Sequence, residues 1–126
     1  MIVKQIRLSQ KAKERLSRLK SRTGINNWNV LCRWALCYSL KQGTIPANIE
    51  FGEESNLEMS WYTFTGENSE IYDSLMIAWC KKMGLETDSK TLAKYFRLNL
   101  ERGISYLAGT KFITNIDDLL QLVMEG

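Results

Sequence analysis

Hydrophobic and polar side chains alternate at the start of the chain. Within residues 2–8, Ile6 and Leu8 fall on one face. Gln5 and Arg7 fall on the opposite face, and an alternation with period two is typical of a strand that is buried on one side. The pattern therefore predicts a short N-terminal strand over residues 2–8.

The following segment has a helical period. Ala12, Leu16 and Leu19 recur at i, i+4 and i+7 and form a narrow apolar stripe. Ser9 suits the cap at the start of a helix, and Gly24 suits the left-handed residue that ends one. We therefore expect a helix over residues 10–22.

A second helix is predicted over about 27–42, capped by Asn26 and ended by Gly43. Its side chains are apolar almost all round, and such a helix is buried on most sides, in part by another subunit. We expect this helix to form the core of a homo-oligomer through Trp28, Leu31 and Trp34.

Beyond residue 43 the pattern predicts a loop at 44–56, a strand or extended arm at 57–65, and three helices. The helices are expected at about 68–83, 88–102 and 115–124, with Gly84 and Gly103 ending the first two and a short turn at 104–108. The first of these helices should bury Ile71, Leu75, Ile77, Ala78 and Trp79. The predicted fold is mainly α: one domain with a short strand, two helices, an extended arm and three further helices.

Length and composition agree with a single domain over residues 1–126. The chain is 44% hydrophobic and 25% charged, which is close to the globular average. No stretch reaches the roughly 18 apolar residues of a membrane span, and the N-terminus has no apolar signal core. We expect a cytoplasmic protein, whose Cys32, Cys37 and Cys80 are buried, reduced thiols, since no histidine or zinc-type spacing accompanies them.

Charge is divided unevenly along the chain. Residues 1–43 hold ten Lys or Arg and one acid, Glu14, and have a net charge of +9. Residues 44–126 hold seven Lys or Arg and thirteen acids, a net charge of −6. Such asymmetry indicates a polyanionic partner for one end of the molecule.

The predicted first helix concentrates this charge. Four cations recur at i, i+4, i+7 and i+11 beside the apolar stripe: Lys11, Arg15, Arg18 and Arg22. Lys13 and Lys20 flank the other side. Like charges at this spacing repel each other, and DNA phosphates would relieve that repulsion. The alternative is a solubilising surface, or one that pairs with the acidic part of the chain.

Two further positions suit DNA. Gln5 and Arg7 would face a groove if the N-terminal strand paired with its copy in a second subunit, and both residue types can hydrogen-bond base edges. Asn26 and Asn27 open a helix whose free N–H groups could hold a phosphate. Ordinary surface and capping roles are the alternatives.

No catalytic set is recognisable in the sequence. The chain has no histidine, no phosphate-binding GxxxxGK[ST] loop and no GxGxxG loop. Asp117 and Asp118 suit the positive end of a helix dipole better than a metal. We expect no catalytic residues, no metal and no cofactor.

Three segments carry a family resemblance: IRLSQKAKERLSRLKSRTGI at 6–25, NNWNVLCRWALCYSL at 26–40 and YFRLNLERGISYLAG at 95–109. They resemble DndE, the small subunit of the bacterial DNA phosphorothioation system, and the likeness extends over nearly the whole chain. The resemblance implies a ribbon-helix-helix variant that forms homotetramers and binds DNA, preferably nicked duplex. It also implies work beside a cysteine desulfurase and an iron–sulfur, nucleotide-using partner, which together replace a non-bridging phosphate oxygen with sulfur.

The expected function is therefore a non-catalytic DNA-binding subunit that holds duplex or nicked DNA by its backbone. Two alternatives remain open. One is a sequence-specific ribbon-helix-helix repressor, and the other is a scaffold that binds acidic proteins. An intrinsic nickase lacks the catalytic groups it would need.

Overall fold

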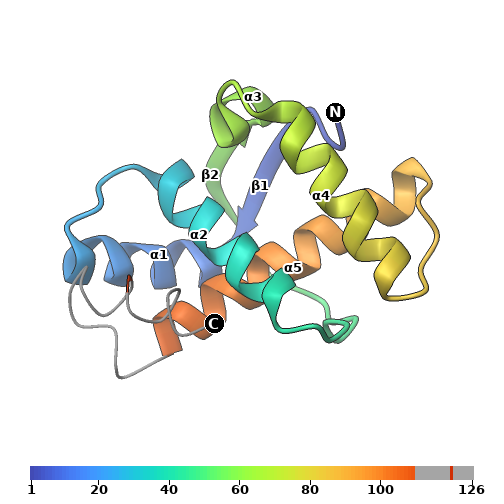
Figure 1. Ribbon diagram of the computed structural model, residues 1–126. Coiled ribbons are helices and arrows are strands. Elements are labelled where there is room, and N and C mark those ends of the chain that lie inside the picture. Colours follow the sequence, from blue (N-terminus) through green and yellow to red (C-terminus); the bar gives the residue numbers. More distant parts are fainter. Residues whose placement is uncertain (110–119, 121–126) are drawn as a thin grey trace.

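The computed structural model describes residues 1–109 and Leu120, and these residues form a mainly helical fold, as predicted (Figure 1). The elements in chain order are β1 (Gln5–Ser9), α1 (Gln10–Thr23), α2 (Trp28–Lys41), β2 (Glu54–Ser60), α3 (Trp61–Thr65), α4 (Ser69–Lys82) and α5 (Ser89–Gly109). The predicted last helix at 115–124, with Asp117 and Asp118, lies outside the described residues except for Leu120.

The N-terminal strand pairs within its own chain. β1 lies antiparallel to β2, with Gln5 opposite Ser60 and Arg7 opposite Glu58. Ile6 is buried in the core, whereas Gln5 and Arg7 are exposed, so the predicted alternation is confirmed. Because β2 belongs to the acidic part of the sequence, the basic and acidic parts fold together.

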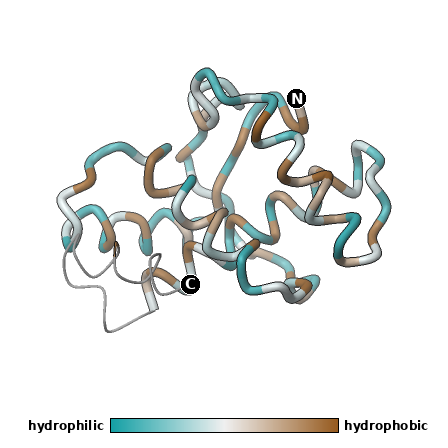
Figure 2. The backbone as a smooth tube through the Cα atoms, in the orientation of Figure 1, coloured by the Kyte–Doolittle hydropathy of each residue, from teal (hydrophilic) through white to brown (hydrophobic). Residues whose placement is uncertain are grey.

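The first helix forms as its sequence predicts. The hydroxyl oxygen of Ser9 accepts a hydrogen bond from the backbone N–H of Ala12, which is the expected N-cap contact. Gly24 adopts φ 74° and donates its N–H to the carbonyl of Lys20 at 3.0 Å. Hydrophilic and hydrophobic segments alternate along this helix in Figure 2, and the buried face consists of Ala12, Leu16, Leu19 and Thr23.

The prediction that Gly103 ends a helix is wrong. α5 continues to Gly109 and crosses α2 at Gly103, where a Cβ atom would lie 1.9 Å from the carbonyl oxygen of Ala35. Glycine inside a helix costs about 0.5–1 kcal/mol relative to alanine, but here it allows two backbones to approach closely. The helix therefore passes through the position that the sequence suggested as its end.

The predicted arm at 57–65 is a strand followed by a short helix. Ser60 caps α3 by accepting a hydrogen bond from the N–H of Thr63 at 3.0 Å. Trp61 and Phe64, three positions apart, both point inward and contact Phe96 of α5 with ring centroids 5.1 and 5.3 Å away. This aromatic cluster fixes the end of the sheet over α5.

α4 has nearly the predicted bounds but not the predicted buried face. Met76, Trp79 and Cys80 are its buried residues, whereas Ile71 is 63% and Leu75 is 36% exposed. Ala78 is also exposed, so the expectation that these three lie inside is wrong. The helix carries apolar side chains on two faces, and it packs on α3 and α5 through only one of them.

Candidate nucleic-acid interface

The four cations predicted to form one stripe lie on α1, beside its buried face. Lys11, Arg18 and Arg22 are exposed, and Arg15 is half-buried. At a rise of 1.5 Å per residue, the eleven positions from the first to the last span about 16 Å. We call these residues, Lys11, Arg15, Arg18 and Arg22, the basic stripe.

No cation of the basic stripe forms an ion pair with an acid within residues 1–109. The ion pairs of that part join the N-terminal amine to Asp73, Arg7 to Glu58, and Arg97 to Glu54. Arg22 donates to the carbonyl oxygen of Ala108 at 3.2 Å, and this neutral acceptor supplies no opposite charge. The expected alternative, pairing with the acidic part, is not seen for any described acid.

The arginines of α5 differ from those of α1. Arg102 donates to the carbonyl oxygen of Ser39 at 2.9 Å and to the hydroxyl of Thr44 at 2.9 Å, and so satisfies the end of α2. Burial of Arg102 lowers the pKa of its guanidinium from the usual value. These contacts give Arg102 a structural role at the end of α2, whereas among the stripe cations Arg22 makes a single such contact, with the backbone of Ala108.

The two lysines that flank the basic stripe are held by their own chain. Lys13 donates to the side-chain oxygen of Asn56, which precedes the middle of β2. The ammonium of Lys20 lies 4.0 Å from the centroid of the Trp28 ring. Both lysines therefore keep their charge close to α1, and each already contacts a side chain of its own chain.

The two candidates for base reading lie on β1. Arg7 is engaged by Glu58, with 3.1 Å between the guanidinium nitrogen and the carboxylate oxygen. Gln5 is exposed opposite Ser60. The groove-reading hypothesis required β1 to pair with its copy, whereas the described sheet pairs β1 with β2.

The start of the second helix differs by one residue from the prediction. Asn27, not Asn26, occupies the N-cap, and its side chain makes no capping hydrogen bond. Asn27 is exposed and follows directly on the loop at the end of α1. It therefore remains available to a ligand at the start of α2.

The predicted oligomer residues have different surroundings. Leu31 is 0% exposed in the core of the single chain, so it offers no surface to a second subunit, and the prediction is corrected for this residue. Trp28 and Trp34 are half-buried. The prediction that all three cysteines are buried is wrong for Cys37, which is exposed. Cys32 and Cys80 are buried as expected.

Sequence reasoning missed Glu101. Its carboxylate is 5% exposed and accepts two hydrogen bonds from Ser9 at the start of α1. Burial, and secondly the charge of Glu101, raise the pKa of the Cys32 thiol to about 12. The signal was present, because this acid stands at helical spacing between Leu98 and Ala108, both of which are buried.

Within the described part of the chain, no three side chains of His, Cys, Asp or Glu gather as metal ligands would. None of the helices described has the length and hydropathy needed to cross a bilayer. The fold and this surface define a small, mainly helical protein whose N-terminal helix exposes a basic stripe that pairs with none of the described acids.

A family model described as DNA sulphur modification protein DndE matches residues 5–115. The chain belongs to the DndE family, and the resemblance noted in the sequence is confirmed. Its fold is similar to a crystal structure of DndE from Escherichia coli B7A involved in DNA phosphorothioation modification, with TM-score 0.64 and 24% identity over 85% of this chain and 99% of that one. A crystal structure of a DndE mutant involved in DNA phosphorothioation gives TM-score 0.64 and 18% identity over 86% and 99% of the two chains. No curated protein matches the chain.

Proposed function

We propose that this chain is a non-catalytic, cytoplasmic DNA-binding subunit of the DNA sulphur modification machinery, and that it holds duplex or nicked DNA by the phosphate backbone. The observation that carries the proposal is the basic stripe, which has no ion pair with any described acid. Membership of a family named for DNA sulphur modification supports the same substrate.

Backbone binding follows from the spacing of the stripe. A length of about 16 Å along α1 reaches several successive phosphates, which are spaced at about 3.4 Å of axial rise per strand. Each phosphate neutralised by Lys or Arg releases condensed counterions. Lys13 and Lys20 add positive charge on the other side of α1, and Lys20 lies beside Trp28 at the start of α2, near the exposed Asn27.

Recognition of a particular DNA base sequence has less support than binding of the DNA backbone. A ribbon-helix-helix repressor presents a strand paired between two subunits to the major groove. The order β1, α1, α2 suits a variant of that layout, but Arg7 is paired with Glu58, and β1 already pairs along one edge with β2 of its own chain. We therefore propose that any choice of sequence comes from other subunits of the modification complex.

Self-association is part of the proposal. Trp34 is half-buried beside an apolar cavity on α2, and an apolar surface of this kind suits burial by further copies. A homotetramer would bring several basic stripes to one DNA molecule, and multivalency of this kind raises affinity without new contacts.

A salt titration of binding to nicked, intact and single-stranded DNA tests the proposal. We expect log affinity to fall linearly with log salt, by about 0.9 per phosphate neutralised. The double variant Arg15→Glu, Arg18→Glu should weaken binding to every sequence alike and reduce the slope by about 2.

The matched control is Lys90→Glu, Lys94→Glu on α5, which makes the same change in net charge away from the stripe. Equal loss of affinity in both double variants would mean that only net charge matters. Absence of any salt-dependent affinity would instead favour a scaffold for acidic proteins. Nicking of plasmid DNA by highly purified protein in magnesium buffer would contradict the non-catalytic part.

A further inference from the structure

A cavity of about 250 Å³ lies beside the basic stripe, between the start of α1, the loop before β2 and α5. Lys11 and Arg15, two cations of the stripe, belong to its lining. The loop contributes Phe51 and the exposed Ile49 and Glu50, so a ligand on the surface has access to the cavity. A DNA molecule held on the stripe would therefore lie next to it.

Part of the cavity wall is fixed by hydrogen bonds within the chain. Glu101 accepts two hydrogen bonds from Ser9. Arg102 donates to the hydroxyl oxygens of Ser39 and Thr44. These bonds join α1, α2 and the loop to α5, so the fold itself sets the shape of the cavity.

Other polar side chains of the lining are unengaged. In the part of the chain that the structure describes, no hydrogen bond or ion pair occupies the side chains of four lining residues: Lys11, Arg15, Glu50 and Ser105. Cations and a carboxylate thus line one cavity without pairing with each other. Such a lining suits a ligand that carries both a negative charge and hydrogen-bond donors.

One wall of the cavity is aromatic. The guanidinium carbon of Arg97 lies 4.5 Å from the centroid of the Phe51 ring, and Arg97 also pairs with Glu54. The ring is therefore held in place at the edge of the cavity. Proteins commonly bind unpaired bases by stacking them on aromatic side chains.

We propose that this cavity takes up one unstacked nucleobase of the DNA, while Lys11 and Arg15 hold the phosphate of the same nucleotide. The base packs on Phe51. The carboxylate of Glu50 accepts a hydrogen bond from the amino group of the base, and the hydroxyl of Ser105 bonds to its edge. Adenine, cytosine and guanine carry such an amino group and thymine does not, so thymine is the least favoured base.

A nucleotide fits this lining better than a simple anion does. Inorganic phosphate has no planar ring for Phe51, and the carboxylate of Glu50 would repel it. Sites for drug-sized ligands have about 300–1,000 Å³, so a cavity just below that range suits one base. The inference rests on the DNA binding of the proposed function and adds a subsite to it.

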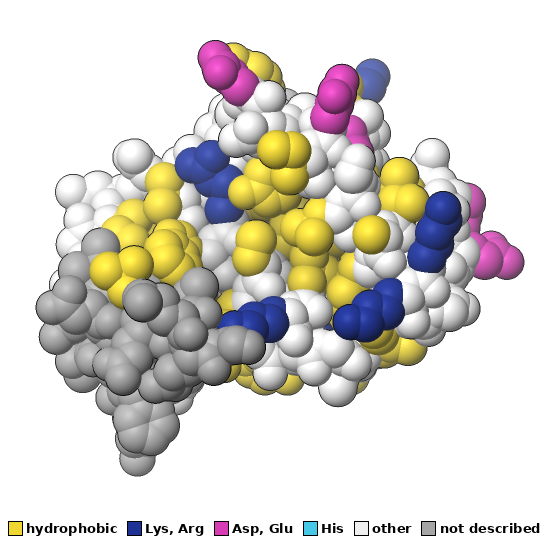
Figure 3. Space-filling view, viewed as in Figure 1, with side chains coloured by type: hydrophobic (Ala, Val, Ile, Leu, Met, Phe, Trp, Pro, Cys, Tyr) yellow, Lys and Arg dark blue, Asp and Glu magenta, His cyan; other side chains and the backbone are white. Residues whose placement is uncertain are grey.

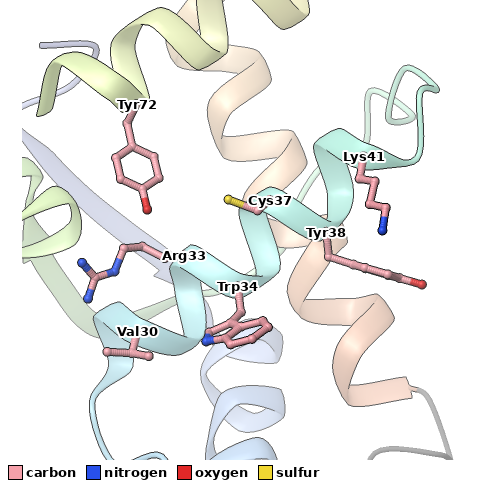
Figure 4. Close-up of a pocket in the computed structure, with 7 residues that line it drawn as sticks. All are labelled: Val30, Arg33, Trp34, Cys37, Tyr38, Lys41 and Tyr72. Atoms are coloured by element: carbon pink, nitrogen blue, oxygen red, sulfur yellow. The ribbon is translucent and has the colours of Figure 1, made fainter. Parts of the chain in front are cut away.

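Another cavity, of about 440 Å³, has a different character. It lies between α2 and α4, and Figure 4 shows Trp34, Cys37 and Tyr38 on α2 with Tyr72 reaching across from α4. Hydrophobic side chains cover a broad area of this face in Figure 3. No cation of the basic stripe lines this cavity. It belongs to the surface to which the proposed function assigns self-association, and the base is therefore assigned to the cavity beside α1.

Affinity for DNA with one unpaired nucleotide tests the proposal. Two duplexes are compared that differ at a single bulged position, which carries a cytosine in one and an abasic sugar in the other. The wild-type protein should bind the cytosine duplex about tenfold more tightly, because only that duplex offers a base to the cavity. A thymine at the same position should give a smaller preference. Equal affinity of the wild type for the cytosine and abasic duplexes would overturn the proposal.

Filling the cavity should abolish this preference. Ser105 is half-buried in the lining, and Ser105→Phe places a ring where the base would lie, whereas Ser105→Ala keeps the space and is the matched control. Ala47→Trp fills the cavity from the exposed loop and leaves α5 unchanged. Both filled variants should bind the two duplexes alike and keep the wild-type salt slope. A preference that survives in Ala47→Trp and Ser105→Phe would place the base elsewhere and overturn the assignment.

The contact of Glu50 with the base has its own test. Glu50→Ala should reduce the preference for cytosine over thymine, whatever it does to overall affinity. Glu53→Ala is the matched control, because Glu53 is an exposed acid of the same loop outside the cavity lining. An unchanged ratio in Glu50→Ala, or an equal loss in both variants, would overturn the role of Glu50.

These outcomes are separable from those of the salt titration. A protein that binds DNA with the expected salt slope but does not distinguish cytosine from an abasic sugar would contradict the base subsite alone. A protein without salt-dependent DNA affinity would contradict the proposed function itself.

Discussion

The carboxylate of Glu101 on α5 holds Ser9 at the start of α1. One oxygen accepts the backbone N–H of Ser9 at 2.9 Å, and the other accepts its hydroxyl at 2.6 Å. In a capping box, a Glu at the third helical position makes the backbone contact. Here Ala12 stands at that position and has no such side chain. Glu101, 92 residues away along the chain, accepts the backbone N–H of Ser9 instead. The start of the helix that carries the basic stripe is thereby tied to the core helix.

Glu101→Gln should therefore destabilise the fold. An amide places a donor where the carboxylate accepts two bonds, and hydrogen bonds to charged groups contribute about 1.5–3 kcal/mol each. Urea denaturation should show a loss of this size, whereas the exposed Glu86→Gln should change stability by less than about 0.5 kcal/mol. Combining the variant with Ser9→Ala should cost less than the sum of the two. Additive losses would show that the two residues act independently.

Gly103→Ala should be among the most damaging single changes in the protein. The added Cβ would lie 1.9 Å from the backbone oxygen of Ala35, which cannot rotate away. Overpacking costs about 1–3 kcal/mol in most cores, and a contact with backbone belongs at the upper end or above. Thermal unfolding should show a clear fall in melting temperature. Gly109→Ala is the matched control on the same helix, because nothing lies within 4 Å of its Cβ position.

Arg7→Ala should leave the relative affinities for different DNA sequences unchanged. Its exposed ion pair with Glu58 is worth at most about 1 kcal/mol, so the protein should remain folded. Competition between unrelated duplexes measures the ratio of affinities before and after the change. A preference that is present in the wild type and lost in this variant, or in Gln5→Ala, would favour the sequence-specific repressor.

Thiol reactivity should separate the three cysteines. Cys37 is exposed, so one thiol should react with an aromatic disulfide in the native protein and three in denaturant. Burial and the nearby charge of Glu101 hold the pKa of Cys32 at about 12, so raising the pH from about 8 to 10 should not make a second thiol reactive in the native protein. Fast reaction of two thiols at the lower pH would contradict the buried position of Cys32.

The raised pKa of Cys32 also predicts how stability depends on pH. Because the pKa of this thiol is higher in the folded protein than in the unfolded chain, the free energy of unfolding should fall as the pH rises above about 9.

The N-terminal segment could be predicted well because its signals are local. Ser9 and Gly24 bracket α1, and the period of Ala12, Leu16 and Leu19 marks its buried face. The spacing of the four stripe cations follows from the same helical period. A hydrogen-bonded cap and a repeat of 3.6 residues depend on neighbours within one or two turns, so the sequence alone defines them.

The errors lie where distant segments meet. In the sequence, Gly103 resembles the end of a helix. In the structure, a glycine is needed there because the backbone of Ala35 on α2 leaves no room for a Cβ atom. Ile71 and Leu75 resemble core residues because α4 is apolar on two faces, and periodicity does not say which face packs. Leu31 was expected at an interface and is buried within its own chain.

The sequence by itself determined the bounds and buried face of α1, the basic stripe and the family, since these depend on local periodicity, on charge and on segments of matching residues. Only the tertiary structure decided how that stripe is anchored and what surrounds it. The contact of Glu101 with Ser9 and the pairing of β1 with β2 join residues far apart in the chain. Such contacts depend on how whole elements pack around one core, and no local pattern of side chains specifies that packing.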